Sequence, residues 1–387
     1  MVRKMQEAAI LDQMENIRVV DSGNMLKRLM ETPQYCEDAL QLAQKIEIPQ
    51  KVNISEKISI KYKKPRHIIM TGMGGSAIGG EILQDWLRED FPISIEVCRD
   101  YDLPAYADED TLIVSVSYSG DTEETLSTLL DAVNRRCMIV TITSGGHMLH
   151  FAEKLGLPCV TIMNGLPPRV AIPYLFFPLP IILVKMGLLT NRDEEIREAI
   201  RVLRKLSEEN SPETSVKNNF SKRLALDLAE TIPVVYGFRH YGAIAHRIKT
   251  QFNENTKIPS KYEVFPELNH NEVMGWEATE DITRKFSIIL LRDSDEPPEI
   301  RHRIETTKRL ALSRTHKVLE IPAKGEKKLA KMLSTMYIGD LVSFYLAILR
   351  KTDPTPVKTI SEIKSELSKK LDTVKALEQE FKRLSET

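Results

Sequence analysis

The sequence predicts an α/β fold in which two doubly wound parallel sheets follow one another along the chain. Three observations predict it. Apolar runs that end in glycine or a polar loop recur along the chain, segments with helical spacing separate them, and the whole series starts again in the second half. The chain of 387 residues is long enough for two domains of this kind.

The first series begins with an apolar run that ends in glycine, HIIMTG (residues 67–72), as expected of a buried parallel strand. Helical spacing follows at 76–90 and again at 123–136. Further strands are expected at 93–100, 111–120, 137–145 and 158–165. Strands and helices that alternate in this way favour a parallel sheet covered on both faces.

The second series resembles the first only loosely, which indicates an internal duplication with insertions. Its strands are expected at 231–238, 260–268, 286–293 and 316–323, and a long, mostly apolar helix is expected at 329–350. We therefore expect a first domain over residues 1–190 that includes N-terminal helices, a second domain over 191–350, and a helical tail over 351–387.

The tail carries apolar residues three or four positions apart, which predict one helical stripe. The stripe consists of Ile360, Ile363, Leu367, Leu371, Val374, Leu377, Phe381 and Leu384. Such a helix is expected to pack on its own domain or across a dimer.

Charge and composition exclude several classes of protein. The 54 basic and 55 acidic side chains give a net charge of −1, so no general attraction to nucleic acid or to an anionic membrane is expected. The most apolar stretch, residues 170–187, is interrupted by prolines, and the N-terminus lacks the apolar core of a signal peptide. The four cysteines have no short metal-ligand spacing. We expect a soluble, cytoplasmic protein without a metal site.

The loop after the first strand, TGMGGSAIGG (71–80), could hold an anion. Gly72, Gly74 and Gly75 let the backbone approach a ligand, and the N-terminus of the following helix offers unpaired N–H groups. The loop also fits the dinucleotide pattern G-x-G-x-x-A, but Asp100, the acidic partner, lies farther along the chain than is usual. The sequence has no Walker lysine motif, which disfavours a nucleoside triphosphatase. A purely structural glycine turn is the other interpretation.

The loop after the third strand favours a phosphate ester. SVSYSGDTEETL (115–126) presents three hydroxyl groups close together, and capping of the next helix explains only one of them. With the serine of the first loop, four hydroxyl groups could converge on the C-terminal edge of one sheet, where ligands bind in open α/β folds. The expected phosphate-binding residues are Gly74, Gly75, Ser76, Ser117, Ser119 and Thr122.

These two loops, GMGGSAIGGE and SYSGDTEETL, resemble the sugar isomerase (SIS) domain family, whose members bind sugar phosphates. The duplicated architecture is similar too, because isomerases of this family carry two flavodoxin-like SIS domains. Later segments resemble the bifunctional phosphoglucose/phosphomannose isomerase branch: GLPPRVAIPYLF (165–176), QFNENTK (251–257), ELNHNEVMGWE (267–277) and DPTPVKTISEIKSEL (353–367). The resemblance covers most of the chain.

The resemblance implies reversible isomerisation of glucose 6-phosphate or mannose 6-phosphate to fructose 6-phosphate through a cis-enediol. It implies a homodimer and neither a cofactor nor a metal. Glu254 of the N-E-N motif is expected to shuttle the proton, and Arg169 to stabilise the enediolate. His270, donated by the neighbouring subunit, and Lys364 are expected to open the sugar ring, with Lys358 as the alternative lysine.

Other interpretations stay open at this point. Outside the resemblance, Glu254 could be a solvated helix residue, His270 a surface loop residue and Arg169 a surface salt-bridge partner. A non-catalytic SIS regulator would bind a sugar phosphate and control a partner, but the sequence has no helix-turn-helix signature and no basic patch. Only the glycine loop favours a dinucleotide-dependent oxidoreductase. Use of mannose 6-phosphate depends on the room beside C2 of the sugar, which residue spacing does not determine.

Overall fold

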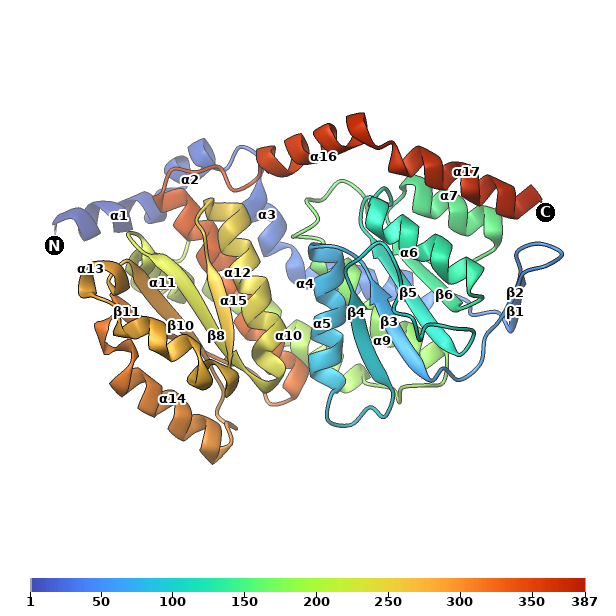
Figure 1. The fold of residues 1–387 in the computed structure, drawn as a ribbon. Coiled ribbons are helices and arrows are strands. Elements are labelled where there is room, and N and C mark those ends of the chain that lie inside the picture. The colour runs from blue at the N-terminus through green and yellow to red at the C-terminus, as the bar shows by residue number, and fades with distance from the viewer. Residues whose placement is uncertain (1, 387) are drawn as a thin grey trace. The chain divides into compact units, whose positions relative to one another are not determined.

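The computed structural model describes residues 2–386, with side chains described from Gln6 to Leu384. The chain forms two compact units, each built around one parallel sheet (Figure 1). The first-sheet unit comprises Gln34–Asn191 and Val357–Thr387, and the second-sheet unit comprises Met1–Pro33 and Arg192–Pro356. This grouping differs from the sequence-based division, which placed the N-terminal helices with the first sheet and kept the tail separate.

The sheet of the first-sheet unit has the strand order β4-β3-β5-β6-β7, and all its strands are parallel. Every position of β5 and β6 is buried, which explains why their sequences are mostly apolar and their few polar residues are small. The strand order reverses beside β3, so the sheet is doubly wound. The strands are β3 (His67–Thr71), β4 (Ser94–Cys98), β5 (Thr111–Ser117), β6 (Met138–Thr143) and β7 (Cys159–Thr161).

Helices of this unit follow the strands along the chain and cover the sheet (Figure 1). They are α5 (Gly75–Leu87), α6 (Glu123–Asn134), α7 (Gly146–Leu155), α8 (Ile172–Phe176) and α9 (Pro178–Lys185). Before the first strand of the sheet lie α4 (Thr32–Gln44) and a short antiparallel hairpin of β1 (Lys51–Asn53) and β2 (Ser59–Lys61).

The expected single stripe of the tail is interrupted. Helix α16 (Lys358–Lys370) ends at Leu371, whose extended backbone separates it from α17 (Thr373–Glu386). Helix α17 packs against α6 and α7, where the Phe381 ring stacks on that of Phe151 with centroids 3.9 Å apart. All residues of α16 are exposed, including the apolar Ile363. Only the second half of the predicted stripe is therefore packed, with Leu377 and Phe381 buried and Val374 and Leu384 partly buried.

The sheet of the second-sheet unit has the order β11-β10-β8-β9, again with all strands parallel. Its strands are β8 (Ile232–Phe238), β9 (Lys261–Phe265), β10 (Phe286–Arg292) and β11 (Lys317–Pro322). Its longer helices are α10 (Asp193–Glu209), α11 (Phe220–Leu228), α12 (Gly242–Gln251), α14 (Pro298–Leu310) and α15 (Lys328–Leu349), and α13 (Glu280–Thr283) is a single turn. The predicted α/β fold with two parallel sheets is confirmed.

Helix α15 is the centre of the second-sheet unit. It contacts α10, α11 and α12, and it also contacts the N-terminal helices α1 (Val2–Asp12), α2 (Met14–Val20) and α3 (Met25–Met30). This packing is the reason why the N-terminal helices group with the second sheet. Among residues 2–386, α15 alone is long and apolar enough to cross a membrane, and 94% of that stretch is buried inside the protein.

Candidate functional site

The loop between β3 and α5 has the geometry of an anion-binding turn. Gly74 has a positive φ of 53° immediately before the first residue of α5, so the N-terminus of a 13-residue helix follows the turn directly. A Cβ atom on Gly75 would lie 3.1 Å from the carbonyl oxygen of Pro168 and 3.7 Å from the amide nitrogen of Arg169. The missing side chain therefore allows the segment that carries Arg169 to lie against this loop.

The loop between β5 and α6 lies beside the first loop, because β5 pairs directly with β3. The Tyr118 N–H donates to Ser76 Oγ over 3.1 Å and joins the two loops. Within the second loop, Ser117 Oγ donates to Thr122 Oγ1 over 3.1 Å, and Ser119 Oγ accepts from the Asp121 N–H over 3.2 Å. The four predicted hydroxyl groups are therefore on one edge of one sheet.

The protons of these hydroxyl groups suit an anionic ligand. Ser76 and Ser119 each accept a hydrogen bond from a backbone N–H, which leaves the hydroxyl proton to be donated. Thr122 accepts from Ser117 and has its own proton to donate in the same way. Ser119 is exposed, whereas Ser76 and Ser117 are buried. Hydroxyl donors beside a helix N-terminus can hold a phosphate group.

A third loop, between β6 and α7, supports the second one. Gly120 has a φ of 75°, and a Cβ atom there would lie 1.8 Å from the carbonyl oxygen of Gly145. Ser144 Oγ donates to the Tyr118 carbonyl oxygen over 2.7 Å, and the Tyr118 hydroxyl accepts from the Leu166 N–H over 2.7 Å. Tyr118 thus connects the hydroxyl-bearing loop to the segment that leads to Arg169.

Sequence reasoning did not identify Tyr118, Ser144 and Gly145. A signal for them was present. Tyr118 stands between the two serines of SYSG, and TITSGG (141–146) repeats the strand–serine–glycine pattern of the second loop. Their contacts hold the hydroxyl-bearing loop in place. Residue spacing does not show whether a loop side chain makes such a contact or points into solvent.

Arg169 is buried, with only 3% of its surface exposed, and it follows two prolines shortly before the start of α8. A buried guanidinium group is costly unless it meets acceptors or an anion, so the position is unlike that of a surface salt bridge. Arg169 and the phosphate-binding candidates belong to the same unit.

Glu254 lies in a π-helical turn, η2 (Phe252–Thr256), which continues α12. Such turns are rare and are frequent at functional sites. The side chain of Asn255 donates to Ser343 Oγ over 2.9 Å, and that of Asn253 donates to the Ile258 carbonyl oxygen over 3.0 Å. The two amides that flank Glu254 thereby anchor the turn, and Glu254 itself is half-buried.

His270 is exposed and ends the short 3₁₀ helix η3 (Glu267–His270) after β9. The structure does not bring it to Glu254 within the second-sheet unit. Glu254 follows α12 and precedes β9, at the amino end of the strand, whereas His270 follows the carboxyl end of β9. At ~3.3 Å per residue, the five-residue strand between them is about 16 Å long.

The two candidate lysines lie on different sides of the exposed helix α16. At about 100° per residue, Lys364 falls on the same face as Ile360 and Leu367, and Lys358 falls on the opposite face. Lys358 Nζ lies 3.7 Å from Glu362 Oε1. The helix geometry therefore distinguishes the two lysines, although both side chains are exposed.

Within the described residues, no group of three or more His, Cys, Asp or Glu side chains is placed to hold a metal ion. The four cysteines are free thiols, and three of them are buried. Burial raises the pKa of the Cys137 thiol to about 12. These thiols are structural apolar groups.

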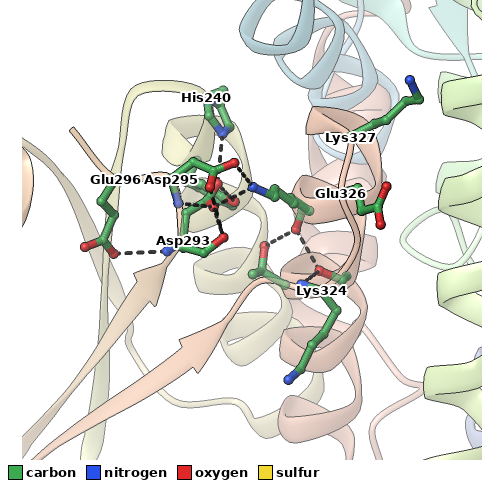
Figure 2. A network of polar contacts seen from close by, with 12 residues as sticks. His240, Asp293, Asp295, Glu296, Lys324, Glu326 and Lys327 are labelled. Atoms are coloured by element: carbon green, nitrogen blue, oxygen red, sulfur yellow. Dashed lines mark hydrogen bonds and ion pairs between the residues drawn. The ribbon is translucent and has the colours of Figure 1, made fainter.

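The carboxyl edge of the second sheet carries a different set of side chains, drawn in Figure 2. Lys331 Nζ donates to Asp293 Oδ1 over 2.9 Å and also pairs with Asp295. The Tyr241 hydroxyl donates to Asp293 Oδ2 over 2.7 Å, and His240 Nε2 lies 3.8 Å from the same oxygen. Burial opposes the ionisation of Asp293, but its contacts with His240, the Asp295 N–H, Tyr241 and Lys331 outweigh burial and lower its pKa.

Comparison with known proteins identifies the family. The model of the bacterial phospho-glucose isomerase C-terminal SIS domain matches residues 217–367. A bifunctional phosphoglucose/phosphomannose isomerase of Caldicellulosiruptor bescii is 40% identical over 345 residues, which are 89% of this chain and 99% of that protein. One from Aquifex aeolicus is 34% identical over 78% of this chain and 90% of its own length.

Solved structures share the fold. A hypothetical protein from Thermus thermophilus superposes with a TM-score of 0.69 at 15% identity, covering 95% of this chain and 96% of that one. Tagatose-6-phosphate ketose/aldose isomerase from Escherichia coli gives a TM-score of 0.61 at 15% identity, over 85% and 94% of the two chains. The SIS-type α/β fold expected from the sequence is thus confirmed, and so is the resemblance: the chain belongs to the bifunctional phosphoglucose/phosphomannose isomerase family.

Proposed function

We propose that this protein interconverts glucose 6-phosphate, mannose 6-phosphate and fructose 6-phosphate by aldose–ketose isomerisation. The observation that carries the proposal is the hydroxyl-lined edge of the first sheet, which lies beside a glycine turn and the start of α5. The family supports the same activity, because a relative that matches this chain at 40% identity is named for both isomerisations. We expect the protein in the cytoplasm, because charged sugar phosphates do not cross a bilayer unaided.

The phosphate group is bound by backbone N–H groups of Gly74 and Gly75 and by the hydroxyl groups of Ser76, Ser119 and Thr122. Ser117 acts through Thr122, because its hydroxyl group donates to Thr122 Oγ1. Neutral donors at a helix N-terminus can stabilise a dianion without a lysine. They grip the end of the sugar away from C1 and C2 and leave those two carbons to the reacting groups.

Glu254 is the base that removes a proton from C2 of the aldose and returns it to C1. A carboxylate suits this step when its surroundings are polar and partly dry, and Glu254 is half-buried on a π turn. The enediolate that forms carries negative charge on O1 and O2. Arg169 can donate two parallel hydrogen bonds to those oxygens. The carbon-bound proton moves from C2 to C1 and the hydroxyl proton moves from O2 to O1, so the reaction is redox-neutral and consumes no co-reactant.

Ring opening needs a proton donor and acceptor at the ring oxygen and the C1 hydroxyl, and His270 and Lys364 take these roles. We propose that the active form is a homodimer in which His270 comes from the partner subunit. Two features support this: His270 is exposed, and it lies at the opposite end of β9 from Glu254. Lys364 is favoured over Lys358 because it shares its helix face with Ile360 and Leu367, which can bring that face against protein.

The first test compares purified wild-type protein with Glu254→Gln in coupled assays of glucose 6-phosphate and mannose 6-phosphate run in parallel. Removal of the base should lower kcat by a factor of about 10² to 10⁴. Binding of fructose 6-phosphate, followed by calorimetry, should stay within about threefold because the phosphate loops are untouched.

Glu299→Gln is the matched control, because Glu299 is also a helix glutamate but is exposed in the first turn of α14. It should leave both kcat and KM unchanged. A Glu254→Gln protein that isomerises at the wild-type rate would remove Glu254 from the mechanism, and a wild-type protein inactive on both sugars would refute the proposed function.

A further inference from the structure

A buried chain of polar side chains connects the π turn of Glu254 to the central helix α15. On the side of α12 and η2, Arg247, Gln251 and Asn255 are all at most 2% exposed. On the side of α15, Asp340 and Ser343 face them, and they are 3% and 0% exposed. These side chains lie within an otherwise apolar, buried helix packing.

The hydrogen bonds run without interruption from one helix to the other. Arg247 Nη2 donates to Asp340 Oδ2 over 2.8 Å, and Ser343 Oγ donates to the Asp340 carbonyl oxygen over 2.7 Å. Ser343 Oγ in turn accepts from Asn255 Nδ2 over 2.9 Å. A weaker contact of 3.4 Å joins Asn255 Nδ2 to Gln251 Oε1.

The two helices approach closely at this place. A Cβ atom on Gly339 would lie 2.4 Å from Cγ1 of Ile248, so glycine is required next to the polar chain. Close approach puts the short Ser343 hydroxyl within reach of the Asn255 amide.

Stability alone does not explain the polar chain. Burial raises the pKa of Asp340, opposed by the charge and the hydrogen bond of Arg247. Asp340 Oδ1 and Gln251 Nε2 are buried without a hydrogen-bond partner among the described residues. An apolar packing of similar volume would avoid these costs, so the polar groups serve the placement of a particular backbone shape.

The backbone shape that they fix is the π turn. A π turn is less common than a continued α-helix, and its extra residue changes the direction of the side chains that follow. Asn255 is the residue after Glu254, so its bond to Ser343 fixes the turn next to the proposed base.

We propose that Ser343 is a positioning residue: by holding Asn255, it keeps the π turn in the form that directs Glu254 at the substrate. This inference rests on the proposed function of Glu254. Ser343 does not touch substrate, so its loss should affect the chemical step rather than binding. A displacement of about 1 Å in a reacting group can lower the rate by as much as 10²-fold.

The test compares Ser343→Ala with Ser334→Ala, a closely matched control in the same helix. Ser334 is also 0% exposed, donates to the carbonyl oxygen three residues earlier over 2.8 Å and accepts a hydrogen bond from the Lys324 N–H over 2.8 Å. We expect similar decreases in Tm for both variants. Only Ser343→Ala should lower kcat for fructose 6-phosphate, by about 10- to 100-fold, with KM within about twofold.

A second variant examines the same bond from its other end. Asn255→Ala should lower kcat as Ser343→Ala does, and the double variant should be no slower than the slower single variant, because one bond is removed in all three. A kcat of Ser343→Ala equal to that of Ser334→Ala, or a double variant that loses the product of the two single effects, would overturn the inference.

Glu254→Gln in the same series separates this inference from the one on which it rests. If Glu254→Gln retains activity, Glu254 is not the base and the proposed mechanism is wrong. If Glu254→Gln is inactive while Ser343→Ala behaves like its control, only the positioning role is wrong.

Discussion

The carboxyl edges of the two parallel sheets use the same scaffold in opposite ways. In the first-sheet unit, hydroxyl groups and a glycine turn leave protons and N–H groups to meet an anion. In the second-sheet unit, the equivalent edge carries Asp293, whose oxygens already bind Lys331 and Tyr241 (Figure 2). An edge whose carboxylates are already paired, and on which Asp295 is exposed, does not suit a phosphate dianion.

The difference indicates how one fold can divide its tasks. Ligands bind at the carboxyl edge of open α/β sheets, yet the side chain that occupies the edge decides whether a ligand can bind there. The second-sheet unit contributes Glu254 from the turn after α12, away from this edge, and His270 from the loop after the edge strand β9, outside the ion pairs of Asp293. Variants that alter each edge can test this division.

The largest effect is expected from Lys331→Met, which removes the cation that pairs with Asp293 and Asp295. The substitution leaves Asp293 buried without its cationic partner, and breaking a buried pair in this way costs about 3–5 kcal/mol. Urea unfolding should show this loss in the free energy of unfolding, while KM for fructose 6-phosphate stays unchanged. Lys327→Met is the control, because its exposed pair with Glu194 is worth at most about 1 kcal/mol. A raised KM in Lys331→Met would contradict the division of tasks.

The next largest effect is expected from Ser119→Asp, which gives the first sheet an acidic edge like that of the second. Ser119 is exposed, so folding should be unaffected, but a carboxylate beside the phosphate group costs several kcal/mol. KM for fructose 6-phosphate should rise by about 10² or more. Ser119→Ala, which only removes a donor to a charged group, should raise KM by about tenfold. If Ser119→Asp binds fructose 6-phosphate normally, the phosphate is held elsewhere.

A smaller effect on stability is expected when the pH is lowered. The folded protein lowers the pKa of Asp293 below its ordinary value of 3.8, so the stability from this group is present above pH 3.8 and is lost as the pH falls below it. The urea midpoint of the wild type should therefore fall between about pH 4 and about pH 2. Lys331→Met, which lacks a cause of the shift, should show a shallower fall. Equal slopes in the two proteins would mean that the network does not control Asp293.

Sequence patterns predicted the elements better than the contacts between them. Mostly apolar runs that end in a polar loop identified β5 and β6, because parallel strands are buried on both faces. The SYSG motif placed three hydroxyl groups in one loop, since loop residues are close in sequence as well as in space. Local patterns therefore contained the fold class and the candidate phosphate edge.

Features that depend on distant partners were not predictable in this way. The helical period of α12 gave no indication of the π turn at Phe252–Thr256, which rests on a bond from Asn255 to Ser343, 88 residues away. The apolar stripe of the tail predicted packing over its whole length, but only α17 is packed on its unit. Periodicity shows that a face is apolar and does not show what covers it.

The central place of α15 also governs the order in which the chain can fold as it is made. The last strand of the first sheet ends at Thr161, so this sheet can assemble while more than half of the polypeptide is still to be synthesised. Helices α1, α2 and α3 emerge first, yet their packing surface, α15, ends at Leu349. The apolar side chains of α1, α2 and α3 therefore stay uncovered until α15 has been made.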